Sequence, residues 1–405
     1  MNRRAFLGFV CSPLCAADWP RFGGPNGDFA IAPPEPPLAW SSKGPGLLWK
    51  SELGPGYSEI VVDGSSLYTM FRRDETREVV VCLDAQTGKT LWEFSYDAPL
   101  PDDYDRSHGT GPRATPLIDG NFLFTIGAGG QTHCFDRTTR KVVWKCDLIS
   151  DFHGSLRVNG YAPSPISWRD TVIVMPNAPG AAIAALRKST GEVVWKKHSY
   201  VVSYATPLIV NSGGHGLLIA QFSDEVTGLD PDTGELLWSH PHANDQKVNV
   251  ASPIWFEDGR LFLSCAYSGA AKMLRVNRTA VEELWSQRLV RIHFSNPVRI
   301  GNTIYASTGD LGPTPLSATD IATGRVLWRD RSITRSSLLA VGTQLLVLDE
   351  DGTLALASPT ATGVEVRGRL AILASPSWTA PTFTGRRIYA RDLHSIVALA
   401  WSEGA

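Results

Sequence analysis

Several common functional signals are missing from this 405-residue sequence. It contains no CxxC or CxxCH motif, which argues against thioredoxin-type redox chemistry and against covalently attached c-type haem. It also lacks a P-loop, a Gly-x-Ser-x-Gly elbow and an HExxH motif, so it offers no phosphate-binding loop, hydrolase nucleophile or zincin site. Its 38 Lys and Arg residues are balanced by 40 Asp and Glu residues. A net charge of −2 provides no basic surface for nucleic acid or for an anionic membrane.

Long hydrophobic runs are also absent beyond the N-terminus. No later stretch offers about 18 uninterrupted apolar residues, so we expect no membrane span in the mature chain. The sequence does have a globular balance of 43% hydrophobic and 19% charged residues, with an unusual 13 tryptophans beside 37 glycines and 27 prolines. The positions of these tryptophans decide the architecture.

The first 17 residues have the pattern of an export signal. Arg3 and Arg4 precede a short apolar stretch, and small residues follow up to Ala17. The paired arginines resemble a twin-arginine signal, and a short Sec signal is the alternative. A lipoprotein signal is disfavoured because bulky residues precede both of its cysteines. We expect a mature chain that begins near Asp18, with an N-terminal extended segment over residues 18–45, in the periplasm or outside the cell.

Four cysteines remain in the mature chain, and they are too few for a disulfide framework. Cys134 and Cys146 flank a predicted hairpin and could form a bridge in an oxidising compartment. Buried free thiols are the alternative for this pair and for Cys82 and Cys265.

A repeated phrase organises the rest of the chain. Leu83-Asp-Ala-Gln-Thr-Gly-Lys-Thr-Leu-Trp92 recurs in variant form five more times, and successive tryptophans are 43 to 52 residues apart. Asp favours an Asx turn, Thr-Gly supplies a left-handed residue, and the apolar run ending in Trp begins a new strand, so each copy predicts a β-hairpin. A second phrase, a small polar residue followed by Pro and apolar residues, recurs about 30 residues before each Trp, as in Thr115-Pro116 and Ser164-Pro165. Each unit therefore holds four short strands, at the period of propeller blades.

The two ends of the chain complete one another. Leu47-Leu48-Trp49 matches the last strand of a unit that has no preceding hairpin, whereas residues 387–399 supply a second and a third strand with nothing after them. A seventh, degenerate hairpin lies around Thr362-Gly363. We predict an all-β fold over residues 46–405: an eight-bladed β-propeller of four-stranded antiparallel blades, closed when the N-terminal strand completes the last blade. Closure protects sheet edges from unwanted pairing.

These phrases resemble the tryptophan-docking repeat of the quinoprotein-like eight-bladed propellers, a family that includes pyrroloquinoline quinone dehydrogenases and the non-catalytic propeller of the outer-membrane assembly machinery. The opening Trp19-Pro-Arg-Phe-Gly-Gly-Pro25 is similar to the start of exported propellers with this repeat. The resemblance implies that the repeated tryptophans pack between blades as a structural girdle. These residues are Trp49, Trp92, Trp144, Trp195, Trp238, Trp285 and Trp328.

Residues just ahead of the first strand of each blade should line the mouth of the central channel. This set is aromatic and cationic, which suits a flat or anionic ligand, although a water-filled rim is the simpler alternative. Its members are Tyr57, Arg113, Tyr161, Tyr204, Asn249, His293, Arg335 and Trp378.

The resemblance also implies what a quinone enzyme would need. The family's dehydrogenases hold the quinone beneath a disulfide between adjacent cysteines, bind Ca²⁺ through Glu, Asn and Asp, and use a further Asp as base. This sequence has no Cys-Cys pair and is shorter than those enzymes. The acidic run Asp102-Asp-Tyr-Asp105 lacks the spacing of a calcium loop and is interpreted as a solvated loop.

We therefore expect no catalytic residue, no metal site and no cofactor. The expected function is that of an exported scaffold that binds a small ligand or a protein partner on its loop face, and we expect the chain to be a monomer. The alternative is an alcohol or sugar dehydrogenase that depends on pyrroloquinoline quinone and Ca²⁺. One scaffold hosts both activities, so the fold alone cannot choose between them.

Overall fold

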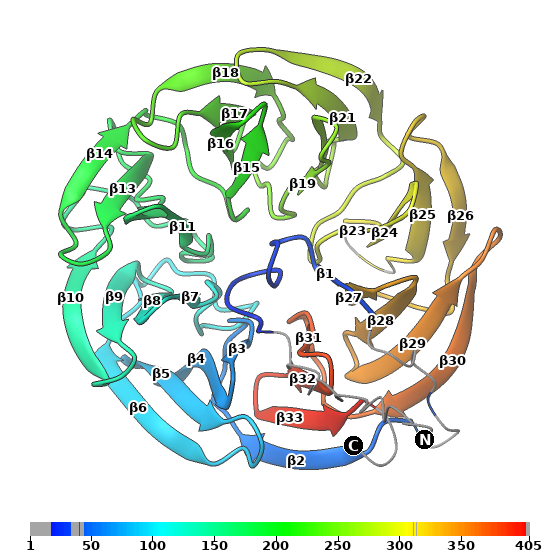
Figure 1. Ribbon diagram of the computed structural model, residues 1–405, viewed down its shortest axis with the longest axis horizontal. Helices are drawn as coiled ribbons and strands as arrows, with labels where there is room; N and C mark the ends of the chain where they lie inside the picture. Colours follow the sequence, from blue (N-terminus) through cyan, green and yellow to red (C-terminus); the bar gives the residue numbers. More distant parts are fainter. Residues whose placement is uncertain (1–17, 34–39, 41–43, 311, 313, 402–405) are drawn as a thin grey trace, which may run out of the picture.

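The computed structural model describes residues 18–33, 40, 44–310, 312 and 314–401. The proposed export signal, residues 1–17, lies outside these residues. Every regular element in the described part of the chain is a β-strand, and the strands form eight sheets arranged as a ring (Figure 1). The predicted eight-bladed propeller is confirmed.

Each blade is an antiparallel sheet whose first strand lies nearest the axis of the ring. Blades 1 to 4 contain β3 (Val61–Asp63), β4 (Ser66–Asp74), β5 (Arg77–Asp84) and β6 (Thr90–Asp97); β7 (Leu117–Asp119), β8 (Phe122–Ile126), β9 (Gln131–Asp136) and β10 (Lys141–Asp147); β11 (Ile166–Trp168), β12 (Thr171–Val174), β13 (Ile183–Arg187) and β14 (Val193–Lys197); and β15 (Leu208–Ser212), β16 (His215–Gln221), β17 (Glu225–Leu229) and β18 (Leu236–Pro241). Blades 5 to 8 contain β19 (Ile254–Trp255), β20 (Arg260–Ser264), β21 (Ala271–Val276) and β22 (Val281–Gln287); β23 (Val298–Ile300), β24 (Thr303–Ser307), β25 (Leu316–Asp320) and β26 (Val326–Asp330); β27 (Ser336–Val341), β28 (Gln344–Asp349), β29 (Thr353–Pro359) and β30 (Val364–Ala371); and β31 (Thr382–Phe383), β32 (Arg387–Arg391), β33 (Ser395–Ala400) and β2 (Leu47–Glu52).

The last blade joins the two ends of the chain, as the sequence predicts. The early strand β2 pairs with the last strand, β33, and Trp49 lies opposite Ala398. Arg391 on β32 strengthens the closure because its guanidinium reaches blade 1. It donates to Thr69 Oγ1 at 2.8 Å, to the carbonyl of Met70 at 2.7 Å and to that of Ser58 at 3.2 Å.

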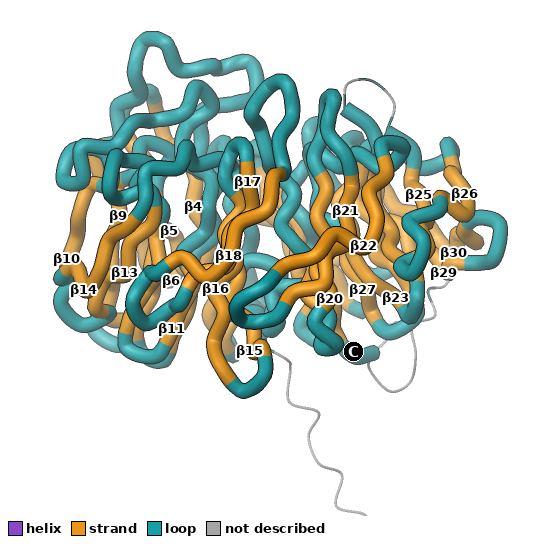
Figure 2. The backbone as a smooth tube through the Cα atoms, turned by 90° about the horizontal axis from the view of Figure 1, so that it is seen from above, coloured by secondary structure: helices purple, strands orange, loops and turns teal. Residues whose placement is uncertain are grey.

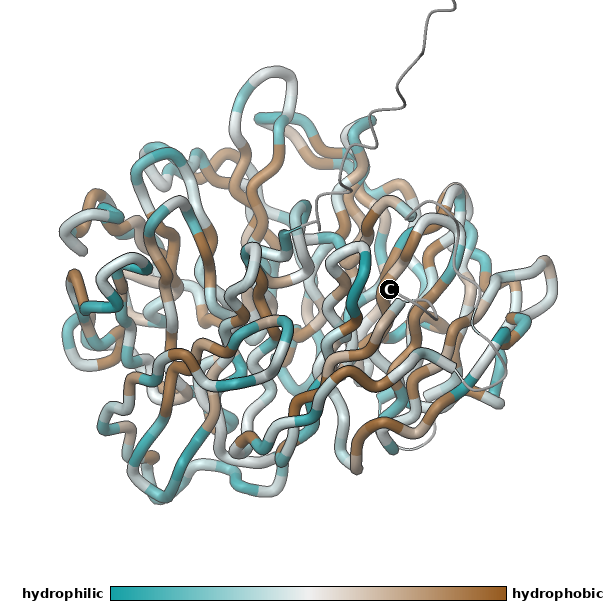
Figure 3. Tube along the Cα trace, turned by 60° about the horizontal axis from the view of Figure 1, so that its bottom comes forward, coloured by the Kyte–Doolittle hydropathy of each residue, from teal (hydrophilic) through white to brown (hydrophobic). Residues whose placement is uncertain are grey.

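The hydrophobic core lies between neighbouring blades. One cluster, for example, joins Phe124 and Trp144 of blade 2 to Val172 and Leu186 of blade 3. Hydrophobic segments follow the strands while hydrophilic residues gather at the turns (Figure 3). Burial of these inner faces supplies most of the driving force for the fold.

Repeated tryptophans link the outer strands to the hairpin of the next blade. The indole N–H of Trp195 donates to the carbonyl of Pro231 at 3.2 Å. The hairpin glycine is needed at this contact, because Gly234 has a φ of +72° and an added Cβ would lie 2.5 Å from the Trp195 ring. The same bond is made by Trp49 to Ala85, Trp144 to Lys188, Trp285 to Ile321 and Trp328 to Thr360. Trp92 packs edge-on against Phe135, and the indole N–H of the buried Trp238 has no partner among the described residues.

The N-terminal segment, residues 18–31, lies across the centre of the ring rather than along its rim (Figure 1). Trp19 pairs with Val62 on β3, the Pro20 carbonyl accepts from the N–H of Ile118 on β7, and β1 (Ala30–Ile31) adds to β27 as a parallel fifth strand. Between these anchors the chain turns sharply at Gly23 and Gly24, both at positive φ. The expected extended segment is therefore folded into the channel, and blade 7 has one strand more than predicted.

Seen edge-on, the strands lie between two layers of loops (Figure 2). The described residues include no helix long and apolar enough to cross a membrane. All four cysteines of the described residues are free, including Cys134 and Cys146 on neighbouring strands. The possible bridge between that pair is therefore not formed.

Candidate functional site

The centre of the ring contains a cavity of about 470 Å³. Residues ahead of several inner strands form its mouth, among them Tyr57. Strand β3 follows Tyr57 and reaches Val62, where Trp19 pairs with it. The N-terminal segment therefore forms the floor opposite the mouth, and it contributes Phe22 and Phe29 to the cavity lining.

Aromatic side chains form one side of the mouth. Tyr57 and Trp378, which come from opposite ends of the chain, stack with ring centroids 5.5 Å apart and planes inclined by 18°. Phe294 lies 5.1 Å from Trp378, and His108 lies 6.0 Å from it. Such a half-buried aromatic surface offers π faces to a flat ligand.

Two arginines add positive charge to this mouth. Arg113 lies over Tyr57 at 5.7 Å and Arg157 lies over Tyr204 at 5.9 Å. Arg157 donates to the carbonyl of Lys247 at 3.1 Å. Neither arginine forms an ion pair with any carboxylate in the part of the chain that the structure describes. Their charge is therefore available to an anionic group, to which guanidinium hydrogen bonds are strong.

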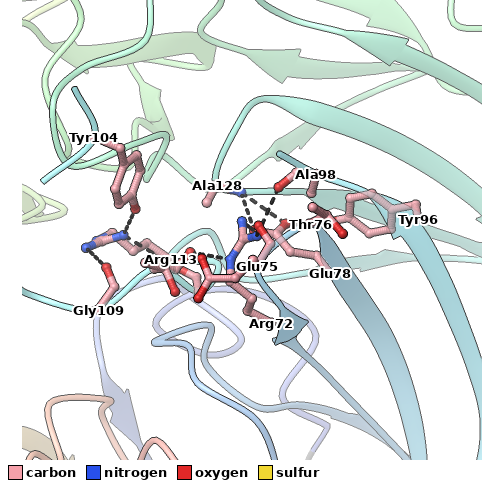
Figure 4. A network of polar contacts seen from close by, with 12 residues as sticks. Arg72, Glu75, Thr76, Glu78, Tyr96, Ala98, Tyr104, Gly109, Arg113 and Ala128 are labelled. Atoms are coloured by element: carbon pink, nitrogen blue, oxygen red, sulfur yellow. Dashed lines mark hydrogen bonds and ion pairs between the residues drawn. The ribbon is translucent and has the colours of Figure 1, made fainter. Parts of the chain in front are cut away.

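A buried network fixes Arg113 in place (Figure 4). Its guanidinium donates to the Tyr104 hydroxyl at 2.5 Å and to the Gly109 carbonyl at 3.1 Å. The Tyr104 hydroxyl donates in turn to the carbonyl of Asn159 at 3.0 Å, so two loops of the mouth are tied together.

Behind this loop, Arg72 and Glu78 form a buried ion pair of 2.7 Å. Arg72 also donates to the carbonyl of Thr110 at 2.8 Å, and Glu78 accepts from the Tyr96 hydroxyl at 2.8 Å. Burial raises the pKa of Glu78, although Arg72 opposes that rise. Because each charge is hydrogen-bonded, the pair serves to hold the mouth loop rather than to react.

His293 lies in the same aromatic cluster. It contacts Phe294 with centroids 4.2 Å apart, and the Tyr267 hydroxyl lies 3.1 Å from its Nε2. Burial, helped by the nearby Arg335, lowers the pKa of His293 to about 4. It is therefore neutral at physiological pH and adds no charge to the mouth.

A belt of hydrogen bonds runs around the channel just below the mouth. Ahead of the inner strands of blades 1 to 5, a backbone N–H donates to a small polar side chain of the next blade. The bonds run from Glu59 to Thr115, from Thr115 to Ser164, from Ser164 to Thr206, from Thr206 to Ser252 and from Ser252 to Asn296, at 2.8 to 3.2 Å. This belt explains why a small polar residue recurs before the Pro of the repeat.

Glu59 departs from this pattern because it places a carboxyl group where blades 2 to 6 have a small polar residue. It lines the cavity, is 5% exposed, and accepts a hydrogen bond at Oε2 from the N–H of Gly23 in the floor. Burial raises its pKa from 4.5 to about 8, and the Gly23 N–H opposes this only weakly. The acid is therefore mostly neutral at pH 7.

Five of the eight mouth residues proposed from the sequence line the cavity together: Tyr57, Arg113, Tyr204, His293 and Trp378. The other three are not among the lining residues, although Arg335 lies beside the mouth, over the rings of Phe294 and Trp378. Tyr161 is buried and its hydroxyl accepts from the N–H of Met175 at 3.1 Å. The Asn249 side chain is fully buried and donates to the Phe222 carbonyl at 2.6 Å. Arg335 pairs with Glu350 at 3.1 Å and lies over Phe294 at 4.6 Å.

Sequence reasoning missed several residues of the cavity. His108 and Arg157 lie within long loops whose paths no repeat specifies, whereas Phe294 follows His293 directly. Glu59 had a detectable signal, since it replaces the small polar residue of the second repeated phrase.

A second hollow, of about 690 Å³, lies outside the channel beside blades 5 and 6. Two of its arginines are already bonded within the chain. Arg291 pairs with Asp310 at 2.9 Å, and Arg329 donates to the carbonyl of Leu289 at 2.7 Å. Its lining includes one aromatic residue, Tyr267, whereas several aromatic rings surround the arginines of the central cavity, so the central cavity is the better site for a flat anion.

The fold and the site define a class: an eight-bladed propeller with the quinoprotein-like repeat and a central cavity that the N-terminal segment helps to line. Within this class, the sequence model described as outer membrane protein assembly factor BamB matches residues 76–330 and 223–377, which is more than half of the chain. The chain belongs to this family.

Relatives of two kinds share the repeat. BamB of Shewanella oneidensis is 20% identical over 296 residues, covering 68% of this chain and 71% of that protein. The quinoprotein alcohol dehydrogenase PedH of Pseudomonas putida is 26% identical over 168 residues, covering 38% of this chain and 25% of that enzyme. The match to PedH thus spans about a quarter of the enzyme's length.

Solved structures show the same fold. BamB of Moraxella catarrhalis aligns with a TM-score of 0.65 at 15% identity, covering 87% of this chain and 99% of that one. The quinohemoprotein alcohol dehydrogenase of Comamonas testosteroni aligns with a TM-score of 0.68 at 14% identity, covering 95% of this chain and 80% of the enzyme. At these identities the likeness concerns the fold alone.

Proposed function

We propose that this chain is an exported, non-catalytic binding protein whose loop face holds a flat, anionic ligand at the mouth of the channel. The observation that carries the proposal is the pair Arg113 and Arg157, which lie over Tyr57 and Tyr204 without a carboxylate partner among the described residues. Stacking and charge-assisted hydrogen bonds are the interactions that such a mouth provides.

The size and shape of the cavity support this proposal. A volume of about 470 Å³ lies within the range of small-molecule sites, and Phe22 and Phe29 of the N-terminal segment help to line the cavity. A partner protein that presents an aromatic and an acidic side chain would use the same face. We also propose that the chain is exported, which its twin-arginine-like leader supports, and that it is a monomer.

The experiment compares two fluorescent probes of similar shape. 8-Anilinonaphthalene-1-sulfonate is anionic, whereas N-phenyl-1-naphthylamine is its neutral counterpart. We expect the purified protein to bind the sulfonate more tightly. Arg157→Gln should weaken sulfonate binding about tenfold, the equivalent of one lost charge-assisted bond, and leave the amine unaffected.

Arg367→Gln is the matched control, because Arg367 lies on the outer strand β30, away from the cavity. It should change neither affinity. Equal affinity for the two probes, or an Arg157→Gln variant that binds both as the wild type does, would contradict an anion-binding mouth.

A dehydrogenase is the second candidate, because quinoprotein alcohol dehydrogenases are among the relatives. The residues present do not fit that cofactor well. The sequence has no adjacent cysteines, and no three His, Cys, Asp or Glu side chains of the described chain lie close enough to hold a metal ion.

The two candidates separate in one assay. Purified protein is incubated with pyrroloquinoline quinone and Ca²⁺, and the absorbance of bound quinone and dye-linked oxidation of ethanol and glucose are measured. Turnover with bound quinone would replace the binding-protein proposal by the dehydrogenase.

A further inference from the structure

Glu59 is the one member of the hydrogen-bond belt, as traced from blade 1 to blade 6, that carries an ionisable side chain. Its backbone N–H keeps its place in the belt by donating to Thr115 Oγ1 at 3.1 Å. The side chain is not needed for this bond, so it is free to serve another purpose.

The carboxyl group instead lies between the floor and the cavity. Oε2 accepts from the N–H of Gly23 at 3.2 Å, and Oε1 has no hydrogen-bond partner among the described residues. Since Oε2 is occupied as an acceptor, we assign the proton of the neutral acid to Oε1 from the hydrogen-bond pattern. The residue lines the cavity, so this O–H is available to whatever fills it.

The floor turn that contacts Glu59 is closely packed and held by backbone hydrogen bonds. Gly23 and the adjacent Gly24 turn with φ values of +71° and +81°, and an added Cβ at Gly24 would lie 2.7 Å from the Trp19 ring. Trp19 is in turn held by paired backbone bonds of 2.8 and 2.9 Å to Val62. The floor and the Glu59 carboxyl group are thus preorganised, which lowers the entropic cost of binding.

Charge is separated along the cavity. Glu59 forms no ion pair among the described residues, whereas the cationic groups lie at the mouth. Arg391 lies behind Ser58, to whose carbonyl it donates at 3.2 Å, and Arg21 and Asp28 belong to the floor segment. The remaining titratable groups that line the cavity are Tyr57, Asp105, His108, Arg113, Arg157, Tyr204, Tyr267 and His293.

We propose that Glu59 is a ligand-recognition residue, whose carboxylic acid donates a hydrogen bond from the floor to a carbonyl-type acceptor at the inner end of a flat ligand. The anionic end of that ligand lies at the mouth, beside Arg113 and Arg157. This inference rests on the proposed function and deepens it, because it names the ligand as a flat molecule with an anion at one end and an acceptor at the other.

The ionisation of Glu59 supports the assignment. With a pKa of about 8, the group keeps its proton at pH 7 and loses it by pH 9.5. A carboxylate facing a carbonyl oxygen repels it, so the contact is lost as the pH rises. Burial raises the pKa of Tyr57 and lowers that of His293, so both stay in one state between these pH values.

The test uses a matched pair of probes. 9-Fluorenone-2-carboxylate has a carbonyl acceptor, and fluorene-2-carboxylate is the same flat anion without it. Calorimetric titrations of the full chain at pH 7.0 and 9.5 give both affinities. We expect the wild type to prefer the fluorenone about fivefold to tenfold at pH 7.0, the value of one hydrogen bond, and to lose this preference at pH 9.5.

Two variants identify the donor. Glu59→Gln keeps an acceptor for Gly23 and an N–H donor toward the cavity but does not titrate, so its preference should persist at both pH values. Glu59→Leu should bind both probes equally. The glutamine variant also separates Glu59 from Arg391, whose pKa burial lowers.

Each outcome decides the question. Equal affinities of the wild type for the two probes at pH 7.0 would overturn the role of Glu59 while leaving the anion-binding mouth standing. A preference that survives in Glu59→Leu would assign the donor to another group and overturn it as well. Failure of both carboxylates to bind would refute the proposed function together with this inference.

Discussion

Replacement of Glu59 by glutamine should change how the stability of the fold depends on pH. The wild-type acid is buried against Gly23, and its pKa rises from 4.5 to about 8. Below pH 4.5 the group is neutral in the native and the unfolded chain, so its favourable contribution is fully present. Between pH 4.5 and 8 the unfolded chain releases a proton that the native protein retains. The wild type therefore loses stability relative to Glu59→Gln across this window and no further above it.

The magnitude follows from the two pKa values. A rise from 4.5 to about 8 corresponds to about 5 kcal/mol of unfolding free energy. Relaxation of the floor segment around an ionised Glu59 would relieve part of this penalty, and about 2 kcal/mol would remain if half were relieved. Either value is a large fraction of the stability of an ordinary protein.

The assay is urea unfolding followed by tryptophan fluorescence, at intervals from pH 4.5 to 9. The difference in unfolding free energy between Glu59→Gln and the wild type should grow with pH and level off above pH 8. Glu235→Gln, at an exposed turn, is the control and should show no such growth. A difference that is the same at pH 5 and pH 9 would refute the burial of a proton-bearing carboxyl group at this position.

Two further predictions concern the bonds between blades. Trp195→Phe should lower the unfolding free energy by about 1 to 2 kcal/mol more than Trp238→Phe does. Both indoles are buried, but only that of Trp195 donates to a carbonyl, which the variant leaves unpaired. Equal urea midpoints for the two variants would contradict this. Arg391→Met should cost about 3 kcal/mol or more, since it removes the donors to three carbonyls and a hydroxyl that join the last blade to the first. A change in calorimetric Tm no larger than that of Arg367→Gln would show that β2 closes the ring without this side chain.

Most of the fold could be predicted because the repeat consists of residue types with strong local conformational preferences. Thr-Gly at a hairpin, Trp on the following strand and a fixed spacing allow the blades to be counted without any long-range information. The degenerate hairpin near Thr362 still forms β29 and β30, because the alternation of apolar and polar residues persists where the Trp is lost.

The site was predicted less completely, because it is built where the repeat stops. Tyr57 and Trp378 occupy equivalent places ahead of β3 and β31, so the repeat itself brings them to the mouth. Tyr161 and Asn249 stand one residue further from β11 and β19 than Tyr57 stands from β3, and the residues that follow them, Ala162 and Val250, line the cavity instead. Because neighbouring side chains of an extended segment point to opposite sides, a shift of one residue directs the side chain into the wall rather than into the cavity.

The path of residues 18–31 had no signal in the periodicity, because an irregular segment fixed by backbone bonds to β3, β7 and β27 leaves no pattern of its own. The contact between this segment and Glu59 nevertheless coincides with a departure from the repeat. Small polar residues at the belt each satisfy an N–H of the preceding blade, so a larger acidic residue at that place is an exception that the ring itself does not require. Its burial disfavours the charged form and weakens the fold at neutral and alkaline pH, and the neutral acid that results is a donor facing the cavity. Blade packing determines which residue types occupy the repeated positions of this scaffold. A residue that departs from the repeat and lowers the stability of the fold is therefore a good candidate for a binding residue, and Glu59 is such a residue.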